Sequence, residues 1–326
     1  MTPETLAAAA AFATAAVVLA ALLRSGVARR VLDHPVGRSM HAVPTPRIGG
    51  YGVLAGLAAG LAAGPGELPL SLYVALAIVA VPSALDDVRS LSAAVRLPLH
   101  LVAATLAVAG ALPDAGWAAM AAVAVVVAWG TNLYNFMDGS DALAGSMAVI
   151  GFGAYAAACA SADPGLAAAC AAIAAAAAGF LAFNLPPARL FLGDAGSTSL
   201  GLLAGAIGVL GAARGLWSPL LPAMVFMPFL FDATATLADR ALRGCRVWEA
   251  HREHAYQRLN LGGFGHRRTA LAYALLMLGS AAVALASHAT GSEWPAFLAL
   301  AAVHGALWLA VRRGWHTGRL PPVERF

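Results

Sequence analysis

Residues 164–188, PGLAAACAAIAAAAAGFLAFNLPPA, contain no charged side chain. A helix that crosses the hydrocarbon core of a bilayer needs about 20 predominantly apolar residues, and this stretch is long enough to supply one. Proline lacks the backbone N–H that a helix interior needs, so Pro186 and Pro187 predict that the helix ends near Phe183. The stretch therefore predicts one membrane-spanning helix with a defined end.

The same lack of charge recurs along the whole chain. Eleven stretches of 17 residues or more contain no charged side chain: 5–23, 48–66, 68–85, 97–113, 115–137, 142–162, 164–188, 195–213, 215–231, 269–292 and 294–311. Because backbone in lipid must satisfy its own hydrogen bonds, we expect an all-α polytopic membrane protein of about eleven transmembrane helices, forming one domain over residues 1–326. A signal peptide is the alternative for the first stretch, but no small-residue cleavage site follows it, so we expect a retained helix.

The composition agrees with a membrane location. Hydrophobic residues make up 60% of the 326 residues and charged residues 11%, whereas a soluble domain carries roughly 25% charged residues. The net charge of +4 is too small and too scattered to indicate a nucleic-acid partner. Three cysteines show neither metal-ligand spacing nor a disulfide framework, and we interpret them as packing residues.

The arginines predict the orientation. With the N-terminus outside, the inside segments are 24–47, 86–96, 132–141, 184–197, 232–268 and the tail beginning at residue 312. These hold 19 of the 20 arginines and leave only Arg214 outside, as the positive-inside rule requires. We therefore expect a periplasmic N-terminus, a cytoplasmic C-terminus and a bacterial inner-membrane location. Because the outside turns are short, any active site is expected in the cytoplasmic loops.

Five carboxylates follow directly on apolar stretches at the cytoplasmic side: Asp86, Asp87, Asp138, Asp141 and Asp194. A lone acid at such a place is more often a solvated residue that marks the membrane exit. Five fit that explanation poorly, because like charges near one surface repel one another. Clustered carboxylate oxygens suit Mg²⁺, with Mn²⁺ as the alternative ion. The cluster therefore predicts a divalent-cation site.

Phosphate-binding side chains occupy two of the same loops. Arginine presents a planar fork that matches phosphate oxygens, and histidine donates from both nitrogens when it is protonated. Anchoring to anionic lipid headgroups is the alternative for the arginines, but histidine adds little to topology. Glycines in these loops could form phosphate cradles or serve helix packing. The candidate phosphate ligands are Arg38, His41, Arg47, His251, Arg252 and His254.

Five blocks of residues, in order along nearly the whole chain, resemble the polyprenyl-phosphate N-acetylhexosamine-1-phosphate transferases of the WecA/MraY superfamily (glycosyltransferase family 4). The first is the D-x-P, R-x-x-H and P-R-x-G-G loop at 33–50, and the second is the Asp86-Asp87 pair. The third is N-x-x-N-F-M-D-G-x-D at 132–141, and the fourth is F-N-x-P-P-A-R-x-F-x-G-D-x-G-S at 183–197. The fifth is Asp232 with the H-R-E-H loop at 251–254. A single acidic pair would carry little weight, but five blocks on one membrane face are specific.

The resemblance implies a role for each matching position. The implied catalytic residues are Asp86, Asp87, Asp138, Asp141, Asp194 and His251, with Asp194 and Asp87 as metal ligands. Either residue of the Asp86-Asp87 pair could instead deprotonate the lipid phosphate. The implied substrate-binding residues are Arg38, His41, Arg47, Asn132, Asn135, Asn184, Arg252 and His254. One departure is Ala142, where the family usually has glycine.

The implied reaction transfers N-acetylhexosamine 1-phosphate from a UDP-sugar to undecaprenyl phosphate, giving undecaprenyl-diphosphate-sugar and UMP. The H-R-E-H form resembles the WbpL-like branch that initiates O-antigen, a lipopolysaccharide component. On that branch FucNAc or QuiNAc is the expected sugar, with GlcNAc and GalNAc as competitors. A homodimer is known in the family, although no residue of this chain indicates one. The alternative function is a transporter or lipid flippase, which would place ionisable groups near the bilayer midplane.

Overall fold

The computed structural model describes residues 2–35, 39–89, 91–249 and 251–317. Over these residues the only strands are β1 (Leu32–Asp33) and β2 (Thr45–Pro46), which pair antiparallel. Most of the other described residues are helical: α1 (Pro3–Arg24), α2 (Gly49–Ala63), α3 (Leu70–Asp86), α4 (Ala93–Ala111), α5 (Trp117–Phe136), α6 (Leu143–Cys159), α7 (Pro164–Asn184), α8 (Gly193–Ala213), α9 (Leu220–Val225), α10 (Met227–Leu242), α11 (Ala255–Leu259), the π-helical segment η1 (Asn260–Phe264), α12 (Gly265–Thr290) and α13 (Glu293–His316). The all-α class is confirmed, and α7 ends one residue beyond the predicted Phe183.

Seven helical segments of the described chain are long and apolar enough to cross a membrane: α1, α4, α5, α7, α8, Ala255–Thr290 and α13. Three further apolar helices, α2, α3 and α6, are shorter. The chain is thus a multi-pass membrane protein, and the count of eleven spans stays a prediction. The stretch 215–231 does not form one helix. It is divided between α9 and α10 at Phe226, two residues before Pro228, because proline cannot donate the hydrogen bond that would continue α9.

Helix α8 lies at the centre of the bundle. It packs against α2, α3, α4, α5 and α6. In its apolar stretch 83% of the residues are buried, compared with 11% in the apolar stretch of α13. Small residues allow this close packing. A Cβ on Gly50 would lie 2.3 Å from the backbone nitrogen of Gly196, so the starts of α2 and α8 approach backbone to backbone. These two glycines therefore serve helix packing in this fold.

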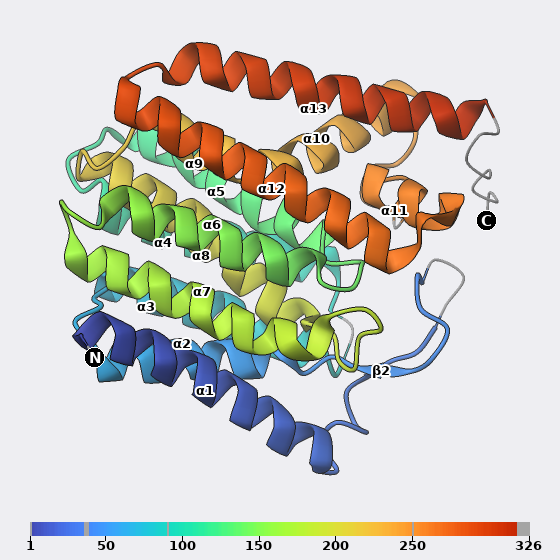
Figure 1. Ribbon diagram of the computed structural model, residues 1–326, viewed down its shortest axis with the longest axis horizontal. Coiled ribbons are helices and arrows are strands. Elements are labelled where there is room, and N and C mark those ends of the chain that lie inside the picture. The colour runs from blue at the N-terminus through green and yellow to red at the C-terminus, as the bar shows by residue number, and fades with distance from the viewer. Residues whose placement is uncertain (1, 36–38, 90, 250, 318–326) are drawn as a thin grey trace.

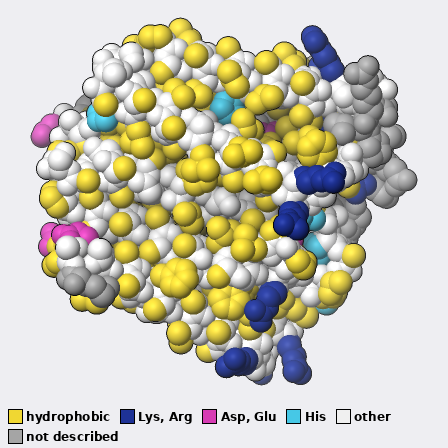
Figure 2. Space-filling view, in the orientation of Figure 1, with side chains coloured by type: hydrophobic (Ala, Val, Ile, Leu, Met, Phe, Trp, Pro, Cys, Tyr) yellow, Lys and Arg dark blue, Asp and Glu magenta, His cyan; other side chains and the backbone are white. Residues whose placement is uncertain are grey.

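The segments predicted to face the cytoplasm lie at one end of the bundle. Figure 1 shows β2 and α11 at the end where α13 finishes, opposite the start of α1. On the face seen in Figure 2, arginines gather toward that same end, and hydrophobic side chains cover most of the rest. The helices thus bring the candidate site residues, which are far apart in sequence, to a common surface.

Ala142, the departure from the family's glycine, has an unusual backbone. Its φ of 62° makes it the only non-glycine residue with positive φ in the described chain. The conformation is held by a hydrogen bond of 2.8 Å from the Ala142 N–H to the Asn184 side-chain oxygen. For an L-residue this left-handed region costs roughly 1–2 kcal/mol relative to ordinary helix geometry. Glycine would adopt it without that steric cost.

We predict that Ala142→Gly stabilises the protein. The relieved strain exceeds the greater unfolded-state entropy of glycine, so the net gain is about 0.5–1 kcal/mol. For a chain of this size that corresponds to a rise in Tm of about 1–3 °C, measured on purified protein in detergent. The matched control is Ala148→Gly in the buried interior of α6, where glycine should lower Tm. A lower Tm for Ala142→Gly as well would contradict this account of the turn.

Candidate active site

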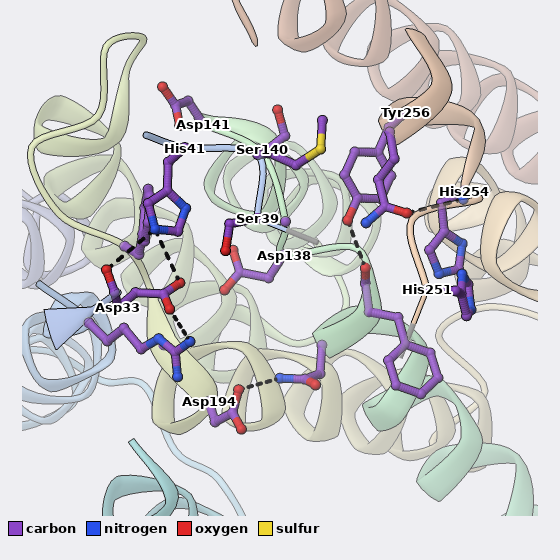
Figure 3. A pocket seen from close by; sticks show the side chains of 18 of the residues that line it. Asp33, Ser39, His41, Asp138, Ser140, Asp141, Asp194, His251, His254 and Tyr256 are labelled. Atoms are coloured by element: carbon purple, nitrogen blue, oxygen red, sulfur yellow. Dashed lines mark hydrogen bonds and ion pairs between the residues drawn. The ribbon is translucent and has the colours of Figure 1, made fainter. Parts of the chain in front are cut away.

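A cavity of about 620 Å³ opens at the end of the bundle that carries β2 and α11. Side chains from five separate segments line it, within 33–47, 86–96, 135–141, 184–194 and 247–266. In the view of Figure 3, Asp33 and His41 lie on one side, Tyr256, His254 and His251 lie on the other, and Asp138 lies between them. The lining is predominantly polar, as a site for a charged, hydrophilic ligand requires.

Asp87 lies behind the cavity and caps the start of α8. Its Oδ1 accepts the N–H of Asp194 at 2.8 Å, and its Oδ2 accepts the N–H of Ala195 at 3.1 Å. The first N–H groups of a helix have no partner within the helix, so this carboxylate satisfies two of them. Gly193 is required at the junction, because its φ is +75° and a Cβ there would lie 2.9 Å from the Asp87 carboxylate.

The carboxylate of Asp194 faces the cavity between two polar side chains. Its Oδ2 lies 3.1 Å from a guanidinium nitrogen of Arg96, and its Oδ1 accepts from Asn135 at 2.9 Å. The same Arg96 nitrogen lies 3.0 Å from Asp86 Oδ2, so one arginine joins the two carboxylates that line the cavity here. Sequence reasoning missed Arg96. The sequence feature that could have identified Arg96 is its position. It directly precedes an apolar stretch, in the segment that also holds Asp86 and Asp87.

The crowding of acids shifts their proton affinities. Burial, and then the charge of Asp194, raise the pKa of Asp87 to about 7. Burial, together with Asp194 and Asp87, raises the pKa of Asp138 well above its usual value. A divalent cation in the same place would favour the ionised carboxylates and lower these pKa values. These carboxyl groups therefore resist ionisation in one another's presence, and a bound cation would favour their ionised form.

The oxygen ligands present fit Mg²⁺ shared with a substrate. Within the part of the chain that the structure describes, no three His, Cys, Asp or Glu side chains converge closely enough to hold a metal ion on their own. Mg²⁺ characteristically binds one or two carboxylates and completes its octahedral shell with phosphate oxygens and water. Asp194 and Asp86 both reach the cavity and could supply such a partial set.

Asn184 uses its side-chain amide to hold backbone. Its oxygen accepts from the Ala142 N–H at 2.8 Å, and its nitrogen donates to the Leu190 carbonyl at 2.9 Å. Although the residue reaches the cavity lining, these two bonds connect the loop after α5 to the loop before α8. The geometry therefore favours a structural contribution for Asn184, and its predicted substrate contact stays a prediction.

Asp141 and His266 connect three loops at the cavity wall. Asp141 Oδ2 accepts the Ala188 N–H at 3.0 Å, and Oδ1 lies 3.3 Å from His266 Nδ1. The other ring nitrogen of His266 lies 2.9 Å from the Met40 carbonyl oxygen. His266, in the basic stretch after the last loop, was not predicted as a site residue. Its position between the first and last loops follows from tertiary packing alone.

The first loop is anchored beside Phe191. Arg47 donates to Asp33 Oδ1 at 2.5 Å, and its backbone forms a parallel bridge with Phe191. His41 Nε2 lies 3.3 Å from the Asp33 carbonyl oxygen, and its ring meets Phe191 edge-on at 4.9 Å. Both Arg47 and His41 line the cavity. The predicted Arg38 lies outside the described residues.

The histidines of the last loop are neutral at pH 7. Burial, followed by neighbouring positive charge, lowers the pKa of His251 and of His254 to about 3. They are therefore not the doubly protonated donors considered from the sequence. His251 Nδ1 accepts the Glu253 N–H at 3.3 Å, which assigns its proton to Nε2. The two rings lie 4.8 Å apart in a loop rather than on one helix face, because α11 begins only at Ala255.

The cavity collects most of the predicted residues. Of those in the described chain, all but three line it, and the three are Asp87, Asn132 and Arg252. Asp87 caps α8 as described above, and the Asn132 amide donates to the Ala128 carbonyl one turn back in α5, at 2.8 Å. Their predicted roles in metal or substrate binding stay predictions. The expected gathering of carboxylates, arginines and histidines at one end of the bundle is what the structure shows.

Comparison with known proteins agrees with this arrangement. Residues 69–212 match the family model for glycosyl transferase family 4. A Bacillus subtilis (strain 168) protein named probable undecaprenyl-phosphate N-acetylglucosaminyl 1-phosphate transferase is 28% identical to the chain over 265 residues. The aligned part is 75% of this chain and 74% of the relative. Over 98 residues, 30% of each chain, this chain is 40% identical to the phospho-N-acetylmuramoyl-pentapeptide-transferase of Bacillus thuringiensis (strain Al Hakam).

The family match covers α3 to α8, the helices that deliver Asp86, Asp138 and Asp194 to the cavity. The alignment with the Bacillus subtilis protein extends the similarity over most of the chain. With the polar cavity at one end of an apolar bundle, these findings agree on one assignment. They support membership of glycosyl transferase family 4, within the WecA/MraY superfamily, and a sugar-1-phosphate transferase activity.

Proposed function

We propose that the enzyme transfers N-acetylhexosamine 1-phosphate from a UDP-sugar to undecaprenyl phosphate and releases UMP. The observation that carries the proposal is the polar cavity in which Asp86, Asp194, Arg96 and Asn135 converge beside the apolar bundle. A hydrophilic diphosphate donor fits such a cavity, and a lipid acceptor can approach it from the surrounding membrane. Undecaprenyl phosphate is also the acceptor in the name of the Bacillus subtilis relative.

The chemistry is a displacement at phosphorus. An oxygen of the lipid phosphate attacks the β-phosphorus of the donor, the bond to the bridging oxygen breaks, and UMP leaves with that electron pair. The lipid phosphate has a second pKa of about 6 and is largely dianionic at neutral pH, so direct attack needs little help from a base. The main difficulty is the approach of two anions, which positioned cationic groups relieve.

The residues divide this work between them. Bound Mg²⁺, or Mn²⁺, would supply charge stabilisation at the diphosphate, with Asp194 and Asp86 as the chain's ligands. Arg96 and Arg47 neutralise further negative charge, and Asn135 orients the Asp194 carboxylate. Asp87 holds the start of α8 in place, and the geometry favours this positioning role over a base or a ligand. Neutral His251 offers an N–H from Nε2 for the sugar or a phosphate oxygen.

The sugar and the pathway are finer parts of the proposal. The H-R-E-H loop favours the WbpL-like branch and with it FucNAc or QuiNAc in O-antigen synthesis. The Bacillus subtilis relative is named for N-acetylglucosamine instead. Turnover of purified protein with undecaprenyl phosphate and UDP-linked FucNAc, QuiNAc, GlcNAc and GalNAc tests the proposal. Lipid-linked product from at least one donor is expected, and none from any of them would overturn it.

A transporter or flippase is less well supported. Such a protein places its ionisable groups near the bilayer midplane. Here Asp86 ends α3, Asp138 follows the end of α5 and Asp194 lies in the first turn of α8, and all three line one cavity. This depth is the one expected for a reaction between a water-soluble donor and a lipid headgroup. We therefore propose a transferase and not a transporter. A homodimer stays an expectation from the family resemblance.

We predict that Asp194→Asn lowers turnover by at least about 100-fold, because asparagine keeps the size but lacks the charge that holds the cation against the diphosphate. The measurement is the rate of UMP release at limiting Mg²⁺. The control is Asp114→Asn, an exposed acid in the α4–α5 turn at the opposite end of the bundle. Undiminished turnover in Asp194→Asn would exclude the metal role.

We further propose eleven spans in the inner membrane with the N-terminus in the periplasm. Reporter fusions at Gly165 and Gly263 test this topology, because the two positions lie in turns predicted on opposite sides. A periplasmic reporter should be active at Gly165 and a cytoplasmic reporter at Gly263. The reverse pattern at both positions would move the cavity to the periplasmic face, where UDP-sugars are not supplied.

A further inference from the structure

We propose that Asp232, which lies outside the cavity, is a positioning residue that fixes the last loop against the loop of Asp138. The inference rests on the proposed function. It concerns the side of the cavity formed by the last loop, whose His251 is proposed above to contact the sugar or a phosphate oxygen of the UDP-sugar, and which we call the donor side. Asp232 is on α10 and is only 4% exposed. Its charge has no arginine partner within the described chain, and the burial of an unpaired carboxylate is costly unless hydrogen bonds satisfy it.

Four hydrogen bonds satisfy the Asp232 carboxylate. Oδ1 accepts from the Ala255 N–H at 2.8 Å and from the Thr236 hydroxyl at 3.2 Å. Oδ2 accepts from the Tyr256 N–H at 3.2 Å and from the Tyr273 hydroxyl at 2.6 Å. The donors come from α10, α11 and α12, so one carboxylate joins three segments. Two of the four are backbone groups at the start of α11.

Those two backbone bonds set the direction in which α11 begins. Tyr256, the second residue of α11, donates its hydroxyl to the Phe136 carbonyl at 3.0 Å. Phe136 ends α5 two residues before Asp138. His254 immediately precedes α11, and its ring lies parallel to that of Tyr256 at 5.9 Å. Because His254, Tyr256 and Asp138 all line the cavity, a shift of α11 would move the last loop relative to the Asp138 loop.

The last loop has a second, independent attachment. Glu253 forms ion pairs with Arg240, Arg243 and Arg258, and none of these contacts involves Asp232. Loss of the Asp232 cap should therefore leave the loop attached to the bundle but displaced. This separates a positioning role from a role in folding, and it makes Asp232→Asn an informative change.

Asparagine is nearly the same size as aspartate but has one carbonyl oxygen and an NH₂ group that cannot accept. In either amide orientation, the N–H of Ala255 or of Tyr256 loses its acceptor. In Asp232→Asn we expect kcat/KM for the UDP-sugar to fall by about 100-fold, since a misplacement of about 1 Å can cost that much. KM for undecaprenyl phosphate should stay within about twofold and Tm close to wild type, because the cap lies on the donor side.

The matched control is Asp163→Asn. Asp163 also caps a helix, accepting the Leu166 N–H at 2.9 Å at the start of α7, and it pairs with Arg214. It lies at the opposite end of the bundle, so its loss should leave donor kinetics unchanged. Should Asp232→Asn fail to fold, Tyr273→Phe removes the 2.6 Å bond and keeps the ring. It should lower the same donor parameter by about 3–10-fold, and unchanged donor kinetics would refute the proposal.

A double-mutant cycle separates positioning from a general loss of stability. If Asp232 acts through the last loop, Asp232→Asn should add little to the loss already caused by His254→Ala, because residues that act as one unit are not additive. Fully additive losses would contradict the proposed coupling, as would equal losses for donor and acceptor.

Hydrogen exchange provides a readout that does not depend on turnover. In Asp232→Asn, amide exchange should accelerate both in residues 255–257 and in the segment 136–141 that Tyr256 contacts. Faster exchange only in residues 255–257 would show that Asp232 caps α11 without positioning the last loop against the Asp138 loop. That result would refute the inference. Absence of turnover in the wild-type protein would refute the proposed function instead, so the two failures are distinguishable.

Discussion

The bond between the Asp87 carboxylate and the first N–H groups of α8 is the contact on which the rest of the site depends. α8 is the most buried of the seven long apolar helical segments, and its start would otherwise leave N–H groups without partners in a largely apolar interior. In its ionised form, a carboxylate at a partly buried helix start contributes up to about 2 kcal/mol. One of the two N–H donors belongs to Asp194, so the cap also fixes where that carboxylate faces. Asp86, the preceding residue, lines the cavity, and the acidic pair therefore serves two different purposes.

The same division recurs around the cavity. Asn184, Asp141 and Asp232 use their polar atoms mainly on backbone and on neighbouring side chains. They help to fix the shape of the loops around the cavity. Arg96 and Asn135 place polar groups around Asp194, where a cation and a diphosphate would be bound. Fixed polar groups of this kind stabilise developing charge without reorganisation during the reaction. Much of the motif therefore acts by building the cavity, and a smaller part faces the ligand.

The sequence predicted the all-α class and the gathering of the site residues at one end of the bundle. Both follow from the positions of the charge-free stretches along the chain. Most of the described residues that it predicted for the site line the cavity, since the five blocks lie next to predicted helix ends. It did not predict that Asp86 and Asp87 have different roles. The side chains of these adjacent acids point in different directions at the end of α3, and the sequence alone does not show this. Arg96 and His266 were missed because their partners are distant in sequence, 98 residues away for the Arg96–Asp194 contact. The break at Phe226 and the neutral histidines depend on local backbone geometry and on burial, which the charge pattern does not report.

In the proposed reaction, the phosphate next to the sugar travels with it. The most direct measurement follows a UDP-sugar that carries a radioactive β-phosphate, incubated with the purified protein, Mg²⁺ and undecaprenyl phosphate. The label should enter the lipid fraction together with the sugar, and the released nucleotide should be unlabelled UMP. Label remaining in released UDP while the sugar enters the lipid would show ordinary glycosyl transfer and contradict transfer of the sugar 1-phosphate. Movement of lipid or sugar across the membrane without any labelled lipid product would contradict it as well.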